Sequence, residues 1–143
     1  MISVIVTTYN RKKLLKETIN SILCQTYEDF ELIVVDNYSD YDFMEFMKSF
    51  GSEKVRAFQN NNNGIIAVNR NFGIKKSKGD YIAFCDDDDL WMKNKLELQM
   101  KYIQEKGCDF ISTGLLYFGK KGVSGTVHHP YKNRFEAFLK NNV

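Results

Sequence analysis

Short runs of apolar, β-branched residues alternate along this chain with longer runs in which apolar residues recur at helical spacing. Residues 2–7 are almost uninterrupted apolar, which is typical of a strand buried on both faces of a sheet. From Leu15 to Leu23 the apolar positions follow a helical period, and Asn10 is a candidate N-cap for that helix. The chain therefore opens with a predicted strand followed by a predicted helix.

The same alternation continues along the rest of the chain. Further strands are predicted at residues 31–35, 54–59, 80–85 and 109–118, and further helices at residues 43–50, 67–77, 92–105 and 131–139. Gly79 and Gly107 are candidate stops for the helices that precede them, and residues 119–125 are predicted to form a turn. Alternating strands and helices favour an α/β fold, with a mainly parallel sheet and helices on both of its faces.

Composition and charge narrow the class of protein. The 143 residues are 43% hydrophobic and 27% charged, which fits one globular domain. A net charge of +2 without a long basic run argues against a nucleic-acid partner, and no apolar run is long enough to span a bilayer. The first residues read as a strand and not as a signal peptide, and the three cysteines are widely spaced. We therefore expect a cytoplasmic protein with free thiols.

Polar residues follow three of the predicted strands, at the edge where a parallel sheet binds its ligands. Residues 7–11 follow the first strand, Asp36 and Asn37 the second, and four successive aspartates, residues 86–89, the fourth. Two carboxylates about 4 Å apart repel by about 4 kcal/mol at an effective dielectric of about 20, so a cation should compensate. Mg²⁺ or Mn²⁺ suits such oxygen ligands, whereas the alternative is a solvated loop that caps the helix near Trp91.

Basic residues in two predicted helices could face an anion at this edge. Arg70 lies in the helix before the fourth strand, where it is either an exposed helix arginine or a phosphate contact. Arg11, Lys12 and Lys13 begin the first helix, whose N-terminal backbone N–H groups also favour an anion. These residues make phosphate binding a hypothesis for this edge.

The chain resembles family-two glycosyltransferases of the GT-A fold. The matching segments occur in family order and at family spacing, at residues 3–11, 21–27, 31–36, 69–74, 79–84 and 86–91. The resemblance extends from residue 2 to about residue 116. It implies a donor-binding α/β domain over residues 1–118, followed by the incomplete start of an acceptor-side region over residues 119–143.

The resemblance also implies a site for a nucleotide-diphospho-sugar. Thr7 and Tyr9 should border the nucleobase, with Asp36 and Asn37 on the base or ribose. Many relatives have a second aspartate at the position of Asn37, and that aspartate recognises uracil. The resemblance therefore favours a UDP-sugar, but Asn37 leaves the choice of base open.

The acidic run carries the remaining implied contacts. Asp86-Asp87-Asp88 reads as the DxD motif, with Asp86 or Asp87 on the ribose and Asp88, joined by Asp86, on Mn²⁺ or Mg²⁺. Arg70 should approach the diphosphate, and we place Arg11 among the substrate-binding residues. The metal would neutralise charge on the departing nucleoside diphosphate.

A catalytic base cannot be assigned. In the family it is an acidic residue well after the DxD motif, and only the last 52 residues follow Trp91. The carboxylates among them match no family base motif; they are Glu97, Glu105, Asp109 and Glu136. The predicted function is transfer of the sugar, with inversion, to a hydroxyl of a glycan or lipid-linked acceptor in surface-polysaccharide or glycoconjugate synthesis. The alternative is a non-catalytic nucleotide-binding or assembly module.

The last predicted helix, residues 131–139, carries an apolar stripe. The stripe favours packing against a missing C-terminal half or another subunit, with ordinary packing on this domain as one alternative. Lys132, Arg134 and Lys140 permit a second alternative, peripheral contact with the inner face of a membrane. His128 and His129 precede Pro130 and are predicted to lie in a surface loop, with metal or diphosphate contact as the alternative.

Overall fold

A computed structural model describes residues 1–119 and 122–127 of the chain. The backbone divides into two units, residues 1–102 and residues 103–143. The predicted helix at residues 131–139 and the two histidines lie outside the described residues. No helix among the described residues combines the length and the apolar character that crossing a membrane requires.

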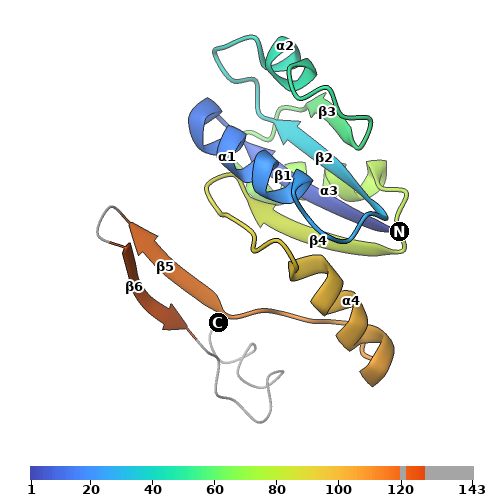
Figure 1. Ribbon diagram of the computed structural model, residues 1–143. Helices are drawn as coiled ribbons and strands as arrows, with labels where there is room; N and C mark the ends of the chain where they lie inside the picture. Colours follow the sequence, from blue (N-terminus) through green and yellow to red (C-terminus); the bar gives the residue numbers. More distant parts are fainter. Residues whose placement is uncertain (120–121, 128–143) are drawn as a thin grey trace. The chain divides into compact units, whose positions relative to one another are not determined.

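The first unit is built on a four-stranded sheet, which is parallel as the sequence predicts and contains the first four of the five predicted strands (Figure 1). Its strands, in the order β3-β2-β1-β4, are β1 (Ile2–Thr8), β2 (Phe30–Asp36), β3 (Val55–Gln59) and β4 (Tyr81–Asp86). The chain builds outward from β1 to β3 and then crosses back to place β4 on the other side of β1. The order of the strands therefore reverses between β1 and β4.

Helices connect the strands and cover the sheet. They are α1 (Lys12–Leu23), α2 (Phe43–Lys48), α3 (Ile66–Lys76) and α4 (Lys95–Lys106). In Figure 1 α1 crosses in front of the sheet and α3 lies behind it, so the two faces are covered by different helices. The predicted α/β class is confirmed. The fourth helix begins at Lys95, three residues later than the hydrophobic pattern predicts.

The two central strands hold the core because they are covered on both faces. Every residue of β2 is buried, and six of the seven residues of β1 are. On the α3 side, Ile5 and Ile33 pack with Phe72. A Cβ on Gly73 would lie 2.6 Å from Cγ2 of Ile5, so α3 approaches β1 as closely as it does because residue 73 has no side chain.

Two predicted helix boundaries are wrong for local reasons. Asn10 does not cap α1: it has a φ of 53°, its side chain accepts a hydrogen bond from Asp40 N (2.8 Å), and Arg11 occupies the N-cap position. Gly79 is not a left-handed stop after α3. A Cβ there would lie 2.7 Å from Ser3 N and 2.8 Å from Met1 O, so this glycine allows the chain to pass close to the start of β1.

The second unit contains a β-hairpin that the sequence does not predict. Strand β5 (Leu115–Gly119) pairs antiparallel with β6 (Gly122–Val127), whereas one strand at residues 109–118 and a turn at residues 119–125 are expected. Residues 109–114 form no strand. Gly122, with a φ of 95°, begins β6. The glycines, serine and threonine of β6 interrupt its apolar pattern, so the hydrophobic pattern alone predicts a turn there and not a strand.

Candidate functional site

The sheet brings the polar strand ends together at its carboxyl edge. In the register of the strands, Thr8 is opposite Asp36 and Thr7 is opposite Asp86. Because β1 lies between β2 and β4, its last residues separate Asp36 on one side from the acidic run on the other. This edge includes the point at which the strand order reverses, where open parallel sheets bind ligands.

Asp87 is the buried member of the acidic run. Its carboxylate is 7% exposed and accepts a hydrogen bond from Thr8 Oγ1 at 2.7 Å through one oxygen and from Arg11 Nη1 at 3.0 Å through the other. Residue 11 is carried to this point because α1 starts directly after β1. The carboxylate of Asp87, followed by that of Asp88, raises the pKa of Arg11. Asp87 is thus a pinned, charge-paired group.

The two neighbours of Asp87 are more exposed, and each pairs with an arginine. Asp88 accepts from the same Arg11 Nη1 at 2.8 Å. Asp86 accepts from Arg70 Nη2 at 2.7 Å, and the guanidinium of Arg70 also lies 5.7 Å from the ring centroid of Phe84. Two arginines, one at the start of α1 and one in α3, therefore supply positive charge that four successive aspartates require.

Asp89 closes the run and is an exposed residue. Partial loss of water around its carboxyl group raises its pKa, and the carboxylates of Asp86 and Asp88 raise it further. The loop after it is tied to α1, because Trp91 N donates to Ser21 Oγ at 3.1 Å. Lys95 Nζ lies 4.6 Å from the Trp91 ring centroid. These contacts make Trp91 an anchor of the loop.

Gln25 also holds the loop after the acidic run. It is uncharged, and the sequence analysis does not identify it as a site residue. Its side chain is buried, donates to Met92 O at 2.8 Å and accepts from Leu96 N at 3.0 Å. It therefore fixes the segment between the acidic run and α4 against the end of α1. The signal in the sequence is a set of polar residues, Ser21, Gln25 and Thr26, around an otherwise apolar helix end.

Asp36, on the other side of β1, is fully buried at the end of β2. One oxygen accepts from Ser39 Oγ, and the other accepts from Ser39 N at 2.9 Å and from Gln59 Nε2 at 3.0 Å. Three of the carboxylate's roughly four acceptor positions are therefore filled by the chain itself. Ser39 and Gln59 are further residues that sequence reasoning does not identify.

Asparagines shape the loop that faces Asp36. Asn37 Oδ1 accepts from Asn62 N at 2.9 Å, and Asn62 Oδ1 accepts from Gly64 N at the same distance. Asn60 Nδ2 donates to Asn69 Oδ1 at 2.8 Å, while Asn69 Nδ2 is buried with no hydrogen-bond partner in the described part of the chain. The asparagine run is thus a folded turn held by side-chain amides.

Thr7 and Tyr9, the two residues predicted to border the nucleobase, are accessible at this edge of the sheet. The side chain of Tyr9 is 54% exposed, although it directly follows a strand of the core. Thr7, one residue before the end of β1, is partly buried. The Tyr9 ring is therefore free to stack on a flat ligand, and neither residue is needed to fill the core.

The acidic run suits a divalent cation that is shared with a ligand. Carboxylate oxygens are the ligands that Mg²⁺ and Mn²⁺ prefer, and Mg²⁺ commonly uses only one or two of them together with substrate phosphates. The Arg11 guanidinium bridges Asp87 and Asp88, so one positive group reaches both carboxylates. Among the described residues no three acidic, imidazole or thiol groups surround one point, so the chain offers no complete cage of its own.

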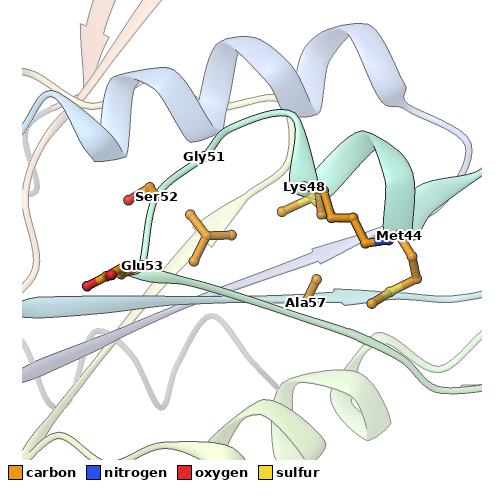
Figure 2. Close-up of a pocket in the computed structure, with 8 residues that line it drawn as sticks. Met44, Lys48, Gly51, Ser52, Glu53 and Ala57 are labelled. Carbon is orange, nitrogen blue, oxygen red and sulfur yellow. The ribbon is translucent and has the colours of Figure 1, made fainter.

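A separate hollow of about 380 Å³ lies between α2 and β3 (Figure 2). Met44 and Lys48 of α2 line one side of it, and Ala57 of β3 lies opposite. None of the residues that line it is a predicted site residue. The candidate site is thus the open carboxyl edge of the sheet and not this hollow.

The acidic residues after the run lie in different parts of the chain. Glu97 Oε2 accepts from Thr26 Oγ1 at 2.6 Å and so ties α4 to the end of α1. Glu105 and Asp109 lie in the second unit, and Glu136 lies outside the described residues.

Comparison with known proteins adds the family. The sequence model of "Glycosyl transferase family 2" matches residues 3–143. TuaG of Bacillus subtilis, a glycosyltransferase named provisionally for teichuronic acid biosynthesis, is 30% identical over the whole chain. WfgD of Escherichia coli, named as a UDP-Glc:alpha-D-GlcNAc-diphosphoundecaprenol beta-1,3-glucosyltransferase, is 29% identical over 99% of it.

A solved structure shows the same fold. Residues 1–349 of S. aureus TarS, crystallised in complex with UDP, superpose on 83% of this chain with a TM-score of 0.70 and 31% identity. The chain spans 58% of TuaG, 56% of WfgD and 35% of that TarS chain. The matches therefore concern one part of longer proteins.

Proposed function

This chain belongs to glycosyl transferase family 2, and we propose that the carboxyl edge of its sheet binds the nucleotide part of a nucleotide-diphospho-sugar. The observation that carries the proposal is the meeting of three carboxylates and two arginines where the strand order reverses. Separate anionic and cationic groups are what a diphosphate with its bound divalent ion needs, because the arginines suit phosphate oxygens and the carboxylates suit the ion.

The nucleobase lies on the β1–β2 side of this edge. Tyr9 stacks on the base with its exposed ring, Thr7 borders it, and Asp36 and Asn37 contact the base or the ribose. Within the described residues Asp36 is buried and already accepts three hydrogen bonds, and Asn37 Oδ1 accepts from Asn62 N, so the amide NH₂ of Asn37 is the group best suited to a carbonyl of the base. UDP is favoured, since the name of WfgD includes UDP-Glc and TarS was crystallised with UDP.

The diphosphate lies on the β1–β4 side. Arg70 exchanges its exposed contact with Asp86 for a phosphate oxygen, and Arg11 lies beside it. Asp88, joined by Asp86, would hold Mn²⁺ or Mg²⁺, and Asp86 or Asp87 would meet the ribose. A bound divalent ion would stabilise the negative charge of the departing nucleoside diphosphate as a Lewis acid.

The whole protein then transfers the sugar to a hydroxyl of a glycan or lipid-linked acceptor, with inversion. The name of WfgD, with its diphosphoundecaprenol acceptor, supports a lipid-linked acceptor in surface-polysaccharide synthesis. The second candidate is a non-catalytic nucleotide-binding module. It is favoured because none of the carboxylates after the acidic run lies in a segment that matches the family's base motif. Both candidates require the same nucleotide site.

Calorimetry tests the site directly. The chain is titrated with UDP, GDP and dTDP, each with and without Mn²⁺, and so are Asp88→Ala and Glu53→Ala. We expect binding of UDP that depends on Mn²⁺, a loss of at least about tenfold in affinity for Asp88→Ala, and no change for Glu53→Ala, which removes an exposed carboxylate at the α2–β3 hollow. Absence of heat with all three nucleotides at millimolar concentration would remove the proposal.

Transfer activity separates the two candidates. Release of UDP from a UDP-sugar by this chain in the presence of an acceptor lipid would exclude the non-catalytic module. Binding of UDP without any release would favour that module for this part of the protein.

A further inference from the structure

Arg11 holds two aspartates that differ in burial and in their other contacts. Asp87 is 7% exposed and is also held by Thr8. Asp88 is 45% exposed, and within the described part of the chain its side chain accepts a hydrogen bond from Arg11 alone. A hydrogen bond between exposed charges is worth little because water competes for both groups, whereas a buried charge-paired group is costly to separate. The Arg11–Asp88 contact is therefore the weaker of the two.

The guanidinium of Arg11 occupies the position at Asp87 and Asp88 where a divalent metal ion would otherwise bind. It lies 3.0 Å from an oxygen of Asp87 and 2.8 Å from an oxygen of Asp88, through the same Nη1 nitrogen. A divalent ion that coordinates Asp88 must compete with this nitrogen for the carboxylate. Arg70 pairs with Asp86, the other expected ligand, but it lacks the second anchor that Arg11 has in a buried carboxylate, and its guanidinium lies over Phe84 instead.

We propose that Arg11 is a positioning residue, a built-in counter-cation that holds Asp88 in place before a divalent ion binds and releases it when the ion arrives. Arg11 stays anchored to Asp87 throughout, because Thr8 and burial fix that carboxylate. The inference rests on the proposed donor site, since it assumes that Asp88 takes the ion. In this role Arg11 competes with the ion for Asp88. A residue that only contacted the substrate would not compete with the ion.

Binding of Mn²⁺ to the chain without nucleotide tests the competition. The EPR signal of free Mn²⁺ is measured against protein concentration for the unmodified chain, Arg11→Gln and Arg11→Lys. We expect Arg11→Gln to bind Mn²⁺ about fivefold more tightly, the range set by an exposed ion pair, with Arg11→Lys between the two. A merely structural role for Arg11 would lower the affinity in Arg11→Gln, because the acidic run would lose its order.

Two controls identify the origin of the change. Lys16→Gln removes one exposed charge from α1, more than one helical turn beyond Arg11, and we expect it to leave the Mn²⁺ affinity within about twofold. Asp88→Asn should abolish the difference in Mn²⁺ affinity that Arg11→Gln makes in the unmodified chain. Equal tightening by Lys16→Gln would assign the effect to net charge and overturn the proposal.

Failure of the inference and failure of the donor site give different results. If Arg11→Gln binds Mn²⁺ no more tightly than the unmodified chain while Mn²⁺ and UDP still bind together, the counter-cation role is wrong and the donor site stands. If neither chain binds Mn²⁺, with or without UDP, both proposals are wrong.

Discussion

Carboxylates that look alike in this sequence have different tasks in the structure. Asp36 and Asp87 are buried and hold several hydrogen bonds from the chain, whereas Asp86 and Asp88 are exposed and each accept from one arginine. Residue type gives the charge of a group, but burial and existing partners decide whether it is free to meet a ligand. The exposed pair is therefore the part of the run with room for a ligand.

The buried bond between Thr8 and Asp87 yields a prediction for stability. Thr8→Val keeps the shape of the side chain but removes the hydroxyl donor at 2.7 Å from a buried carboxylate. We expect a loss of about 2 kcal/mol in the free energy of unfolding, because the carboxylate is left with one donor fewer. Urea denaturation measures it.

Thr26→Val is the matched control. It removes a hydroxyl that donates to Glu97 at 2.6 Å in an exposed position, where water replaces the lost donor. We expect a loss of less than about 0.5 kcal/mol. Equal losses for the two variants would contradict the structural role given to Asp87.

At the scale of the elements, Glu31 joins three strands. Its carboxylate, nearly buried in β2, accepts from Ser3 Oγ of β1 at 2.7 Å and from Arg56 Nη1 of β3 at 2.6 Å. Lys78 N, just before β4, donates to it at 2.6 Å. Burial alone would raise the pKa of Glu31, but the hydrogen bonds from Ser3, Arg56 and Lys78 together lower it below its ordinary value of 4.5.

This lowered pKa predicts how stability depends on pH. Because the pKa of Glu31 is lower in the folded than in the unfolded chain, its contribution is present above the unfolded value and is lost as the pH falls through the folded value. We expect the unfolding free energy to fall below about pH 4.5 and to fall less steeply in Glu31→Gln. Urea denaturation between about pH 3 and pH 7 measures both. Identical slopes for the two chains would contradict the prediction.

The hydrophobic pattern predicts elements well where an element packs on the core. The four strands of the sheet and the helices between them are predictable because alternation and helical spacing are dictated by burial. Strand β6 is not, because its residues carry little apolar pattern, and Asn10 does not act as a helix cap because its side chain serves the turn at Asp40. The local sequence therefore predicts neither the strand β6 nor the turn contact of Asn10.

The candidate site is also predictable in part. Its position is predictable, since polar residues after parallel strands meet at one edge. Its internal pairing is not, because Arg11 and Asp87 are 76 residues apart and only the finished sheet brings them together. Ser39, Gln59 and Gln25 have ordinary polar side chains, and their importance follows from hydrogen bonds to residues distant in the sequence or to a buried carboxylate, which the sequence does not state.

At the scale of the whole molecule, the chain corresponds to part of its longer relatives. Residues 3–143 match the family, yet the chain spans 58% of TuaG and 56% of WfgD. The described carboxyl edge carries groups suited to a nucleotide and a metal, whereas no catalytic base is assigned. Donor binding and sugar transfer are therefore separate properties, and donor binding can be measured on this chain alone.

The most direct test is to observe which amides respond to nucleotide. The ¹⁵N-labelled chain is titrated with UDP and Mg²⁺, and the backbone amide shifts are followed by NMR. We expect the largest shifts at the carboxyl edge of the sheet, at residues 7–11, 36–37, 60–62 and 86–89. The amides of Gly51, Ser52 and Glu53, at the α2–β3 hollow, should change little. Largest shifts at that hollow, or none at millimolar UDP, would contradict the claim that this edge is the nucleotide site.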